Sequence, residues 1–98
     1  MQVIYKNRKI EKVCTRADEA RKRYGMEMAE KIQMRLDQIA AADSVEMMVQ
    51  YHIGRCHQLN GQRHQQFAVD LVHPVRLVFE LHGEAGQGVK IMEIIDYH

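Results

Sequence analysis

The hydrophobic period of this 98-residue chain changes near residue 50, and this change constrains the fold more than any other feature. Between Met26 and Ala42, apolar residues recur at the spacing of one helix face, and charged or amide side chains mostly occupy the other. Between Val75 and His82, apolar and polar residues mostly alternate, which is typical of a strand with one buried face. Helical segments followed by consecutive strands predict an α+β fold, with helices packed on a twisted antiparallel sheet.

Local signals place the other elements. We expect a helix over Asn7–Val13, and a second helix that begins at a Thr15-x-x-Asp18 cap and ends at a left-handed Gly25. The Asn60-Gly61 pair favours a type I′ turn between two strands, because both residues tolerate positive φ. The remaining predicted elements are a helical turn over Asp43–Val49 and strands over Gln2–Lys6, Arg55–Leu59, Gln65–Leu71, Val75–His82 and Val89–Asp96.

Length and composition define the class of protein. Residues 1–98 are enough for a single domain with one core. Two cysteines far apart in sequence, seven methionines and no secretory signal predict a reducing, cytoplasmic location. The longest apolar stretches are far shorter than a membrane span, so we expect no membrane partner.

Charge is unevenly distributed, although the net charge is only +1. Residues 1–42 carry ten Lys/Arg and six Asp/Glu, a balance of +4, whereas residues 43–98 carry four and seven, a balance of −3. No carboxylate occurs between Met47 and Ala68, the window that contains the basic residues Arg55, His57 and Arg63. This bias adds nothing to the stability of a hairpin, so it indicates an anionic ligand.

Residues of this window, of the strand over Val75–His82 and of the C-terminal end suit metal-free cleavage of RNA, without a cofactor, although composition alone does not select this chemistry over others. Histidine titrates near neutrality and acts as a base or an acid, for roughly 10²–10⁴-fold in rate. Arginine offers a planar fork that matches phosphate oxygens, and tyrosine stacks on a base or shares a proton. The candidates are His57, Arg76, Asp96, Tyr97 and His98 for catalysis, and Arg55, Asn60 and Arg63 for phosphate binding.

A second group of basic residues lies on the predicted N-terminal helices. Clustered Lys and Arg suit contacts with the phosphates of a nucleic acid. The same pattern also fits a solvated helix face, which is the usual outcome for mixed charge. The residues in question are Lys12, Arg16, Arg21, Lys22 and Arg23.

Other interpretations of these residues depend on spacing and geometry. His52-x-x-x-Cys56-His57 has two metal-ligating residue types, but a structural zinc site needs further closely spaced ligands that the chain does not offer. A nucleophilic Cys56–His57 pair is disfavoured, because adjacent strand residues point to opposite faces, and Cys56 fits better as a small buried residue. From the pattern alone, Arg76 fits a surface arginine on the open face of the sheet as well as it fits a phosphate ligand.

Several motifs, taken together, resemble one toxin family over essentially the whole chain. They are Gly54-Arg55-Cys56-His57-x-Leu59-x-Gly61-x-Arg63, then Gln66-Phe67-Ala68-Val69-Asp70-Leu71, His73-Pro74-x-Arg76-Leu77-x-Phe79-Glu80, and the ending Glu93-Ile94-Ile95-Asp96-Tyr97-His98. This combination resembles the RelE/ParE toxin superfamily, and most of all the HigB toxins of type II toxin–antitoxin systems, also called plasmid maintenance killer proteins. Ala41-Ala42-Asp43-Ser44, after the long helix, also fits this likeness.

The resemblance implies a RelE-like fold and a ribosome-dependent mRNA endoribonuclease that cuts in the ribosomal A site. It also implies a cognate antitoxin with a helix-turn-helix domain. By motif, His57 and His98 share proton transfer, Arg76 stabilises the phosphate, Tyr97 positions the nucleotide and Asp96 orients a neighbour. The basic helices would then face ribosomal RNA.

Two positions depart from the family pattern. Asn60 stands where relatives often have lysine, and Val75 stands where they often have an aromatic residue. The first change removes a cation from the phosphate site and the second removes a stacking platform. Two alternatives stay open: a ParE-like inhibitor that binds gyrase on the same fold, and a weakly active relative that acts in antitoxin and operator binding, which Asn60 favours.

Overall fold

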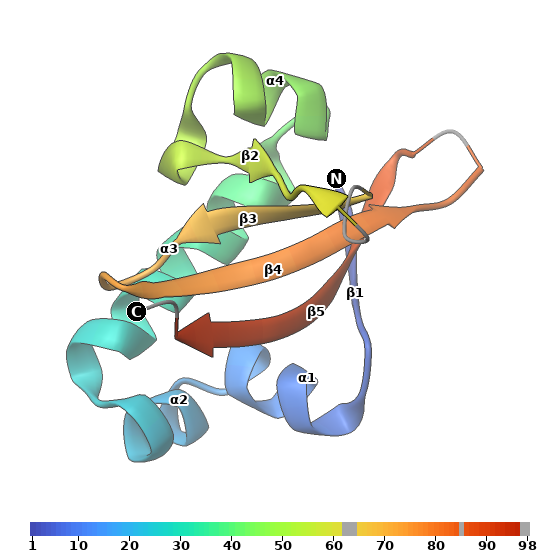
Figure 1. Cartoon of the computed structure of the whole chain (residues 1–98). Helices are drawn as coiled ribbons and strands as arrows, with labels where there is room; N and C mark the ends of the chain where they lie inside the picture. The colour runs from blue at the N-terminus through green and yellow to red at the C-terminus, as the bar shows by residue number, and fades with distance from the viewer. Residues whose placement is uncertain (62–64, 85, 97–98) are drawn as a thin grey trace.

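The computed structural model describes residues 1–61, 65–84 and 86–96. The helices precede all but one of the strands, as the sequence predicts (Figure 1). In chain order the elements are β1 (Gln2–Tyr5), α1 (Arg8–Thr15), α2 (Ala17–Tyr24), α3 (Met26–Ala41), α4 (Val45–Gln50), the 3₁₀ turn η1 (Ile53–Arg55), β2 (His57–Gln58), β3 (Gln66–Asp70), β4 (Val75–His82) and β5 (Gly88–Asp96). The predicted α+β class is confirmed.

The strands form one five-stranded sheet in the order β1-β5-β4-β3-β2. The pairs β2–β3, β3–β4 and β4–β5 are antiparallel, but β1 pairs with β5 in parallel, which corrects the expectation of an antiparallel sheet. A parallel neighbour requires a long connection, and here the helices and three strands separate β1 from β5 in sequence.

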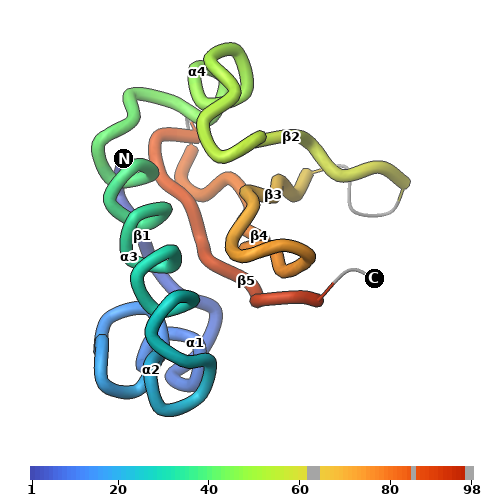
Figure 2. The backbone as a smooth tube through the Cα atoms, turned by 90° about the vertical axis from the view of Figure 1, so that its left-hand side faces the viewer, coloured from blue at the N-terminus to red at the C-terminus, as the bar shows by residue number. Residues whose placement is uncertain are grey.

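The helical layer covers one face of the sheet, as the edge-on view shows (Figure 2). The apolar stripe of α3, with Ile32, Leu36 and Ile39, is buried against Leu77 and Phe79 of β4 in one continuous core. Burial of such side chains stabilises the fold by about 1.5–3 kcal/mol each. The predicted amphipathic patterns of α3 and β4 are therefore the ones that build the core.

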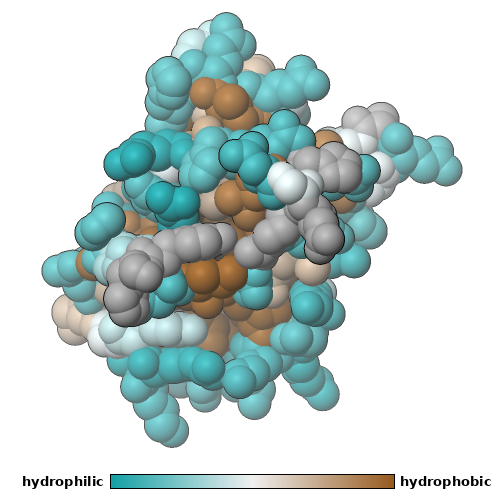
Figure 3. All heavy atoms as spheres, viewed as in Figure 1, coloured by the Kyte–Doolittle hydropathy of each residue, from teal (hydrophilic) through white to brown (hydrophobic). Residues whose placement is uncertain are grey.

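The other face of the sheet carries no described helix (Figure 1). Ala68 and Val78, which are paired across β3 and β4, are fully buried yet lie outside the main core cluster. On this face hydrophobic atoms show at the middle of the sheet, surrounded by hydrophilic side chains (Figure 3). We call this side of the sheet the open face. Arg76 belongs to it, because Arg76 alternates with Leu77, which faces the helices.

Two local predictions are wrong, and a third, the left-handed end of α2 at Gly25, is confirmed in position and in φ but not in ψ. Thr15 does not cap α2, because its hydroxyl donates to the carbonyl oxygen of Glu11 at 2.7 Å, and Arg16 occupies the cap position without a side-chain bond. The Asn60-Gly61 pair is not a two-residue turn, because the Leu59 N–H donates to the Gln66 carbonyl and residues 60–65 lie between them. Gly25 has the expected positive φ of 91°, but its ψ of 168° is extended, since α3 begins at the next residue.

Other element bounds differ slightly from those expected. The strand predicted over Arg55–Leu59 is reduced to two residues, because η1 occupies its start. The helical turn predicted from Asp43 begins instead after Ser44, whose hydroxyl accepts the Met47 N–H at 3.1 Å. Within the described part of the chain, no helix is both long and apolar enough to span a membrane.

Candidate active site

The turn from α4 into β2 has an unusual backbone. His52 and Arg55 adopt left-handed φ angles of 56°, and Gly54 between them has a φ of 57°. A non-glycine residue in this region is disfavoured by about 1–2 kcal/mol, and such strain concentrates at functional sites. The turn brings Arg55 and His57 onto the edge of the sheet next to β3.

His57 is fixed by a contact with its own turn. Its Nδ1 lies 3.0 Å from the carbonyl oxygen of Arg55. A carbonyl only accepts hydrogen bonds, so Nδ1 carries the proton in this contact, and Nε2 is then the basic nitrogen of the neutral ring. The hydrogen bond therefore assigns the tautomer that a general base needs.

One carboxylate joins two arginines beside this histidine. Asp70 Oδ2 lies 3.3 Å from Arg55 Nε, and Asp70 Oδ1 lies 3.5 Å from Arg76 Nε. Asp70 and Arg76 are Cα partners across β3 and β4, so the strand register itself sets the second contact. The side chains of Asp70 and Arg76 are 24% and 31% exposed, whereas that of Arg55 is 79% exposed.

The side chains of Arg55, His57 and Arg76 line one hollow of about 460 Å³ between the η1 turn and the open face of the sheet. Its titratable lining residues are all arginine or histidine, apart from Cys56. Burial raises the pKa of the Cys56 thiol to about 11, so it is protonated at neutral pH and is not a nucleophile. The lining residues are Val49, His52, Arg55, Cys56, His57 and Arg76.

The hollow is braced from the helical layer by Arg35 of α3. Its Nε donates to the backbone carbonyl of Asp70 at 2.6 Å, and its Nη1 donates to Gln38 Oε1 at 2.9 Å. Gly54 packs on this guanidinium, since a Cβ at position 54 would lie 2.8 Å from Arg35 Nε. Gly54 thus adopts its φ without the strain that a Cβ would add, and a Cβ there would force the Arg35 guanidinium to shift.

The structure brings together three of the predicted site residues, namely His57, Arg76 and Arg55. Asn60 is exposed in the segment after β2 and does not line the hollow. Asp96 pairs with Val75, so it alternates with the Arg76–Ile95 pair and belongs to the helix-covered face of the sheet. Tyr97, His98 and Arg63 lie outside the described residues.

The predicted basic residues of the helices are exposed, and none of them lines this hollow. Lys12 and Arg16 line a separate surface hollow along α1. Arg21, Lys22 and Arg23 are exposed residues of α2, and α2 lies on the β5 side of the sheet rather than beside β2 (Figure 1). The two basic regions are therefore distinct surfaces.

Sequence reasoning did not identify Asp70, Arg35 or His52 as parts of the site. Asp70 could have been found, because aspartate is depleted in strands and the predicted strands place it opposite Arg76. Arg35 gave no local signal, since it reaches Asp70 across 35 positions of sequence. Among the described residues, no group of three His, Cys, Asp or Glu side chains is placed to hold a metal ion.

Comparisons with known proteins find likeness in structure alone. No protein-family model and no curated protein sequence matches this chain. Three similar solved structures are a YoeB/ParE toxin from Agrobacterium tumefaciens (16% identity, TM-score 0.64), a YoeB dimer from Staphylococcus aureus (18%, 0.65) and a YoeB–YefM complex from the same organism (18%, 0.66). Each likeness covers 100% of this chain, and 100%, 97% and 97% of the respective solved chains. At these identities the likeness shows a shared fold.

Proposed function

We propose that this chain, which has the fold of the RelE/ParE toxin superfamily, is the toxin of a type II toxin–antitoxin system and acts as a metal-independent endoribonuclease. The observation that carries this proposal is the convergence of His57, Arg55 and Arg76 on one basic hollow. The likeness to YoeB and ParE toxin structures supports the toxin class. The HigB branch, expected from the motifs, stays a prediction.

The arrangement supports in-line attack of a ribose 2′-oxygen on the adjacent phosphorus. His57 Nε2 takes the 2′-hydroxyl proton, and the arginines neutralise the phosphorane as the bond to the 5′-oxygen breaks. The products are a 2′,3′-cyclic phosphate and a 5′-hydroxyl, which receives a proton from an acid. His98 is the proposed partner in proton transfer, Tyr97 the proposed stacking residue and Asp96 an orienting residue.

The partners we propose follow from the fold and the charge. The solved YoeB–YefM complex supports an antitoxin, for which the motifs predict a helix-turn-helix domain. The exposed basic residues of α1 and α2 suit contacts with ribosomal RNA while mRNA occupies the A site. Activity would then take place in the cytoplasm.

Induction of the chain in growing bacteria tests the proposal. Wild type should arrest growth, and primer extension should show cuts in codon register. His57→Ala and Arg76→Ala should each lower cleavage at least about a hundredfold, because each removes a group worth roughly 10²–10⁴-fold. His82→Ala, at an exposed histidine at the far end of β4, is the matched control and should retain activity.

Two results would contradict the nuclease assignment. Growth arrest by all variants without transcript cleavage, together with DNA damage, would favour the ParE-like inhibitor of gyrase. Absence of both transcript cleavage and DNA damage, with retained operator binding in the presence of the antitoxin, would favour the inactive relative.

A further inference from the structure

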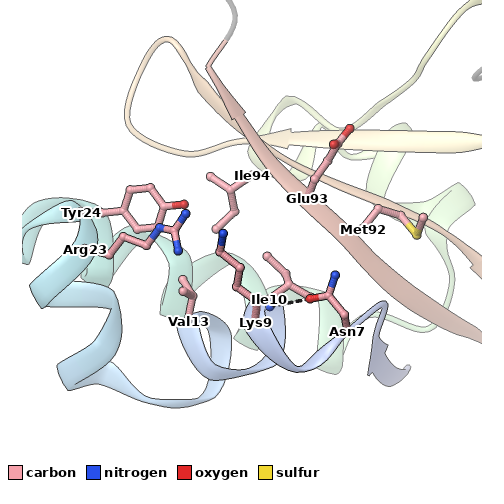
Figure 4. A pocket seen from close by; sticks show the side chains of 9 residues that line it. All are labelled: Asn7, Lys9, Ile10, Val13, Arg23, Tyr24, Met92, Glu93 and Ile94. Atoms are coloured by element: carbon pink, nitrogen blue, oxygen red, sulfur yellow. Dashed lines mark hydrogen bonds between the residues drawn. The ribbon is translucent and has the colours of Figure 1, made fainter.

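A further hollow, of about 160 Å³, opens between α1, α2 and β5 (Figure 4). Its floor is apolar and consists of Ile10 and Val13 from α1 and Ile94 from β5. Lys9 and Arg23 extend over this floor from the two helices. It shares no lining residue with the hollow around His57.

The two cations have no acidic partner among the described residues. Arg23 lies over the ring of Tyr24, with its Cζ 5.6 Å from the centroid, and neither Arg23 nor Lys9 forms an ion pair there. Glu93 also lines the hollow, but its carboxylate points away from α1 and α2 (Figure 4). The hollow therefore presents positive charge above an apolar floor.

The size of the hollow limits what it can hold. A protein cavity of about 150 Å³ accommodates a benzene-sized group, so this one has room for a single apolar side chain. The cations above it complement a carboxylate on either side of that side chain. An RNA base is a poorer match, because Arg23 already covers one face of the Tyr24 ring.

We propose that this hollow docks an acidic protein segment, with one aliphatic side chain on Ile10, Val13 and Ile94 and its flanking carboxylates on Lys9 and Arg23. The partner that would supply the segment is the antitoxin, so the choice of partner rests on the proposed function. The docking chemistry itself rests on the lining of the hollow.

Binding of a short labelled peptide to the full chain tests the site directly. The probe is fluorescein-labelled Glu-Leu-Glu-Leu-Glu, compared with Glu-Ser-Glu-Ser-Glu and Lys-Leu-Lys-Leu-Lys. Lys9→Glu and Arg23→Glu should each weaken binding of the first peptide at least about tenfold, since each replaces an attraction with a repulsion. The matched controls are Lys12→Glu on α1 and Lys22→Glu on α2, which are exposed but do not line the hollow. They should change binding less than about twofold, because charges exposed to solvent are screened over about 8–10 Å.

A structural readout and the oligomeric state complete the test. In methionine-methyl NMR, the leucine peptide should shift Met92, which lines the hollow, and leave Met47 unchanged. The proposal is overturned by equal weakening in all four variants, by equal binding of the serine or lysine peptide, or by no saturable binding to wild type. It is also overturned if wild type sediments as a dimer that Lys9→Glu dissociates, since the occupant would then be a second copy. None of these measurements depends on RNA cleavage. They therefore test the docking site even if the chain is shown not to be a nuclease.

Discussion

Asp70 and Arg76 face each other across β3 and β4, with the carboxylate oxygen Oδ1 3.5 Å from the guanidinium Nε. The same carboxylate reaches Arg55 at 3.3 Å, so one negative charge contacts two cations of the candidate site. Any phosphate in the hollow would share these arginines with Asp70. Asp70 would therefore compete with the phosphate of the proposed RNA substrate for the positive charge of these arginines.

We expect Asp70→Asn to strengthen binding of RNA about tenfold. Two unit charges about 6 Å apart interact by roughly 1–3 kcal/mol near a protein surface, and the substitution removes that repulsion. The measurement is the Kd of an oligonucleotide made uncleavable by 2′-O-methyl groups. Glu80→Gln is the control, because Glu80 has a similar exposure of 30% and pairs with Lys90 instead. Weaker binding by Asp70→Asn would show that orientation of the arginines outweighs repulsion.

Gly54→Ala should destabilise the fold by about 2–4 kcal/mol, through positive φ and through the contact with Arg35. Gly61→Ala is a matched comparison, because Gly61 has a φ of 69° and a Cβ added there would have nothing within 4 Å. Its effect should be about 1 kcal/mol. Urea denaturation gives both values. Equal losses would mean that Arg35 moves aside without penalty.

Asn7→Ala should lower the free energy of unfolding by about 1 kcal/mol. Asn7 Oδ1 accepts the Ile10 N–H at 3.0 Å and so caps α1. Thr15→Ala should change stability by less than about 0.5 kcal/mol, because Thr15 bonds back to Glu11 and caps nothing. Thermal unfolding of both variants checks the assignment, and a larger loss for Thr15→Ala would contradict it.

The two buried thiols should make stability fall in alkaline solution. Burial raises the pKa of Cys14 to about 12 and that of Cys56 to about 11, from 9.0. The unfolded chain thus loses these protons first, and the thiols' contribution, complete below about pH 9, is lost as pH rises towards 11–12. A Cys14→Ala, Cys56→Ala variant should show a shallower decline between pH 9 and 11 in urea titrations. An identical slope would contradict burial of the thiols.

The same thiols should resist a disulfide reagent at pH 8 in the folded protein and react after unfolding, since the thiolate is the reactive form. Rapid reaction of either thiol in native protein would indicate exposure.

The long-period patterns were sufficient to predict the helices and the central strand. The stripe of α3 and the alternation of β4 place Ile32, Leu36, Leu77 and Phe79 on the faces that form the main core, so periodicity alone identifies these residues as core. Strand order, by contrast, is not local. The parallel pairing of β1 with β5 depends on how the helices return the chain, which no short pattern records.

Part of the candidate site could be predicted from sequence, and the rest could not, because it also depends on strand pairing. His57 and Arg76 were identified by residue type and motif, but their link through Asp70 depends on the β3–β4 register. A register shift between Val78 and Phe79 pairs Glu93 with Val78 and Ile91 with Phe79. The extra residue, Met92, moves Asp96 to the face opposite Arg76, and a bulge of this kind leaves no clear signature in sequence.

The hollow around His57 and the hollow under β5 share no lining residue: the first lies between η1 and β4, and the second lies between α1, α2 and β5. A short segment bound between α1, α2 and β5 would therefore occupy none of the residues that line the hollow around His57. If the chain is the proposed nuclease, an antitoxin bound there would inhibit it by preventing its entry into the ribosome, and a short RNA would still reach His57. A toxin–antitoxin complex of this kind would cleave no mRNA on ribosomes but would still bind a dinucleotide.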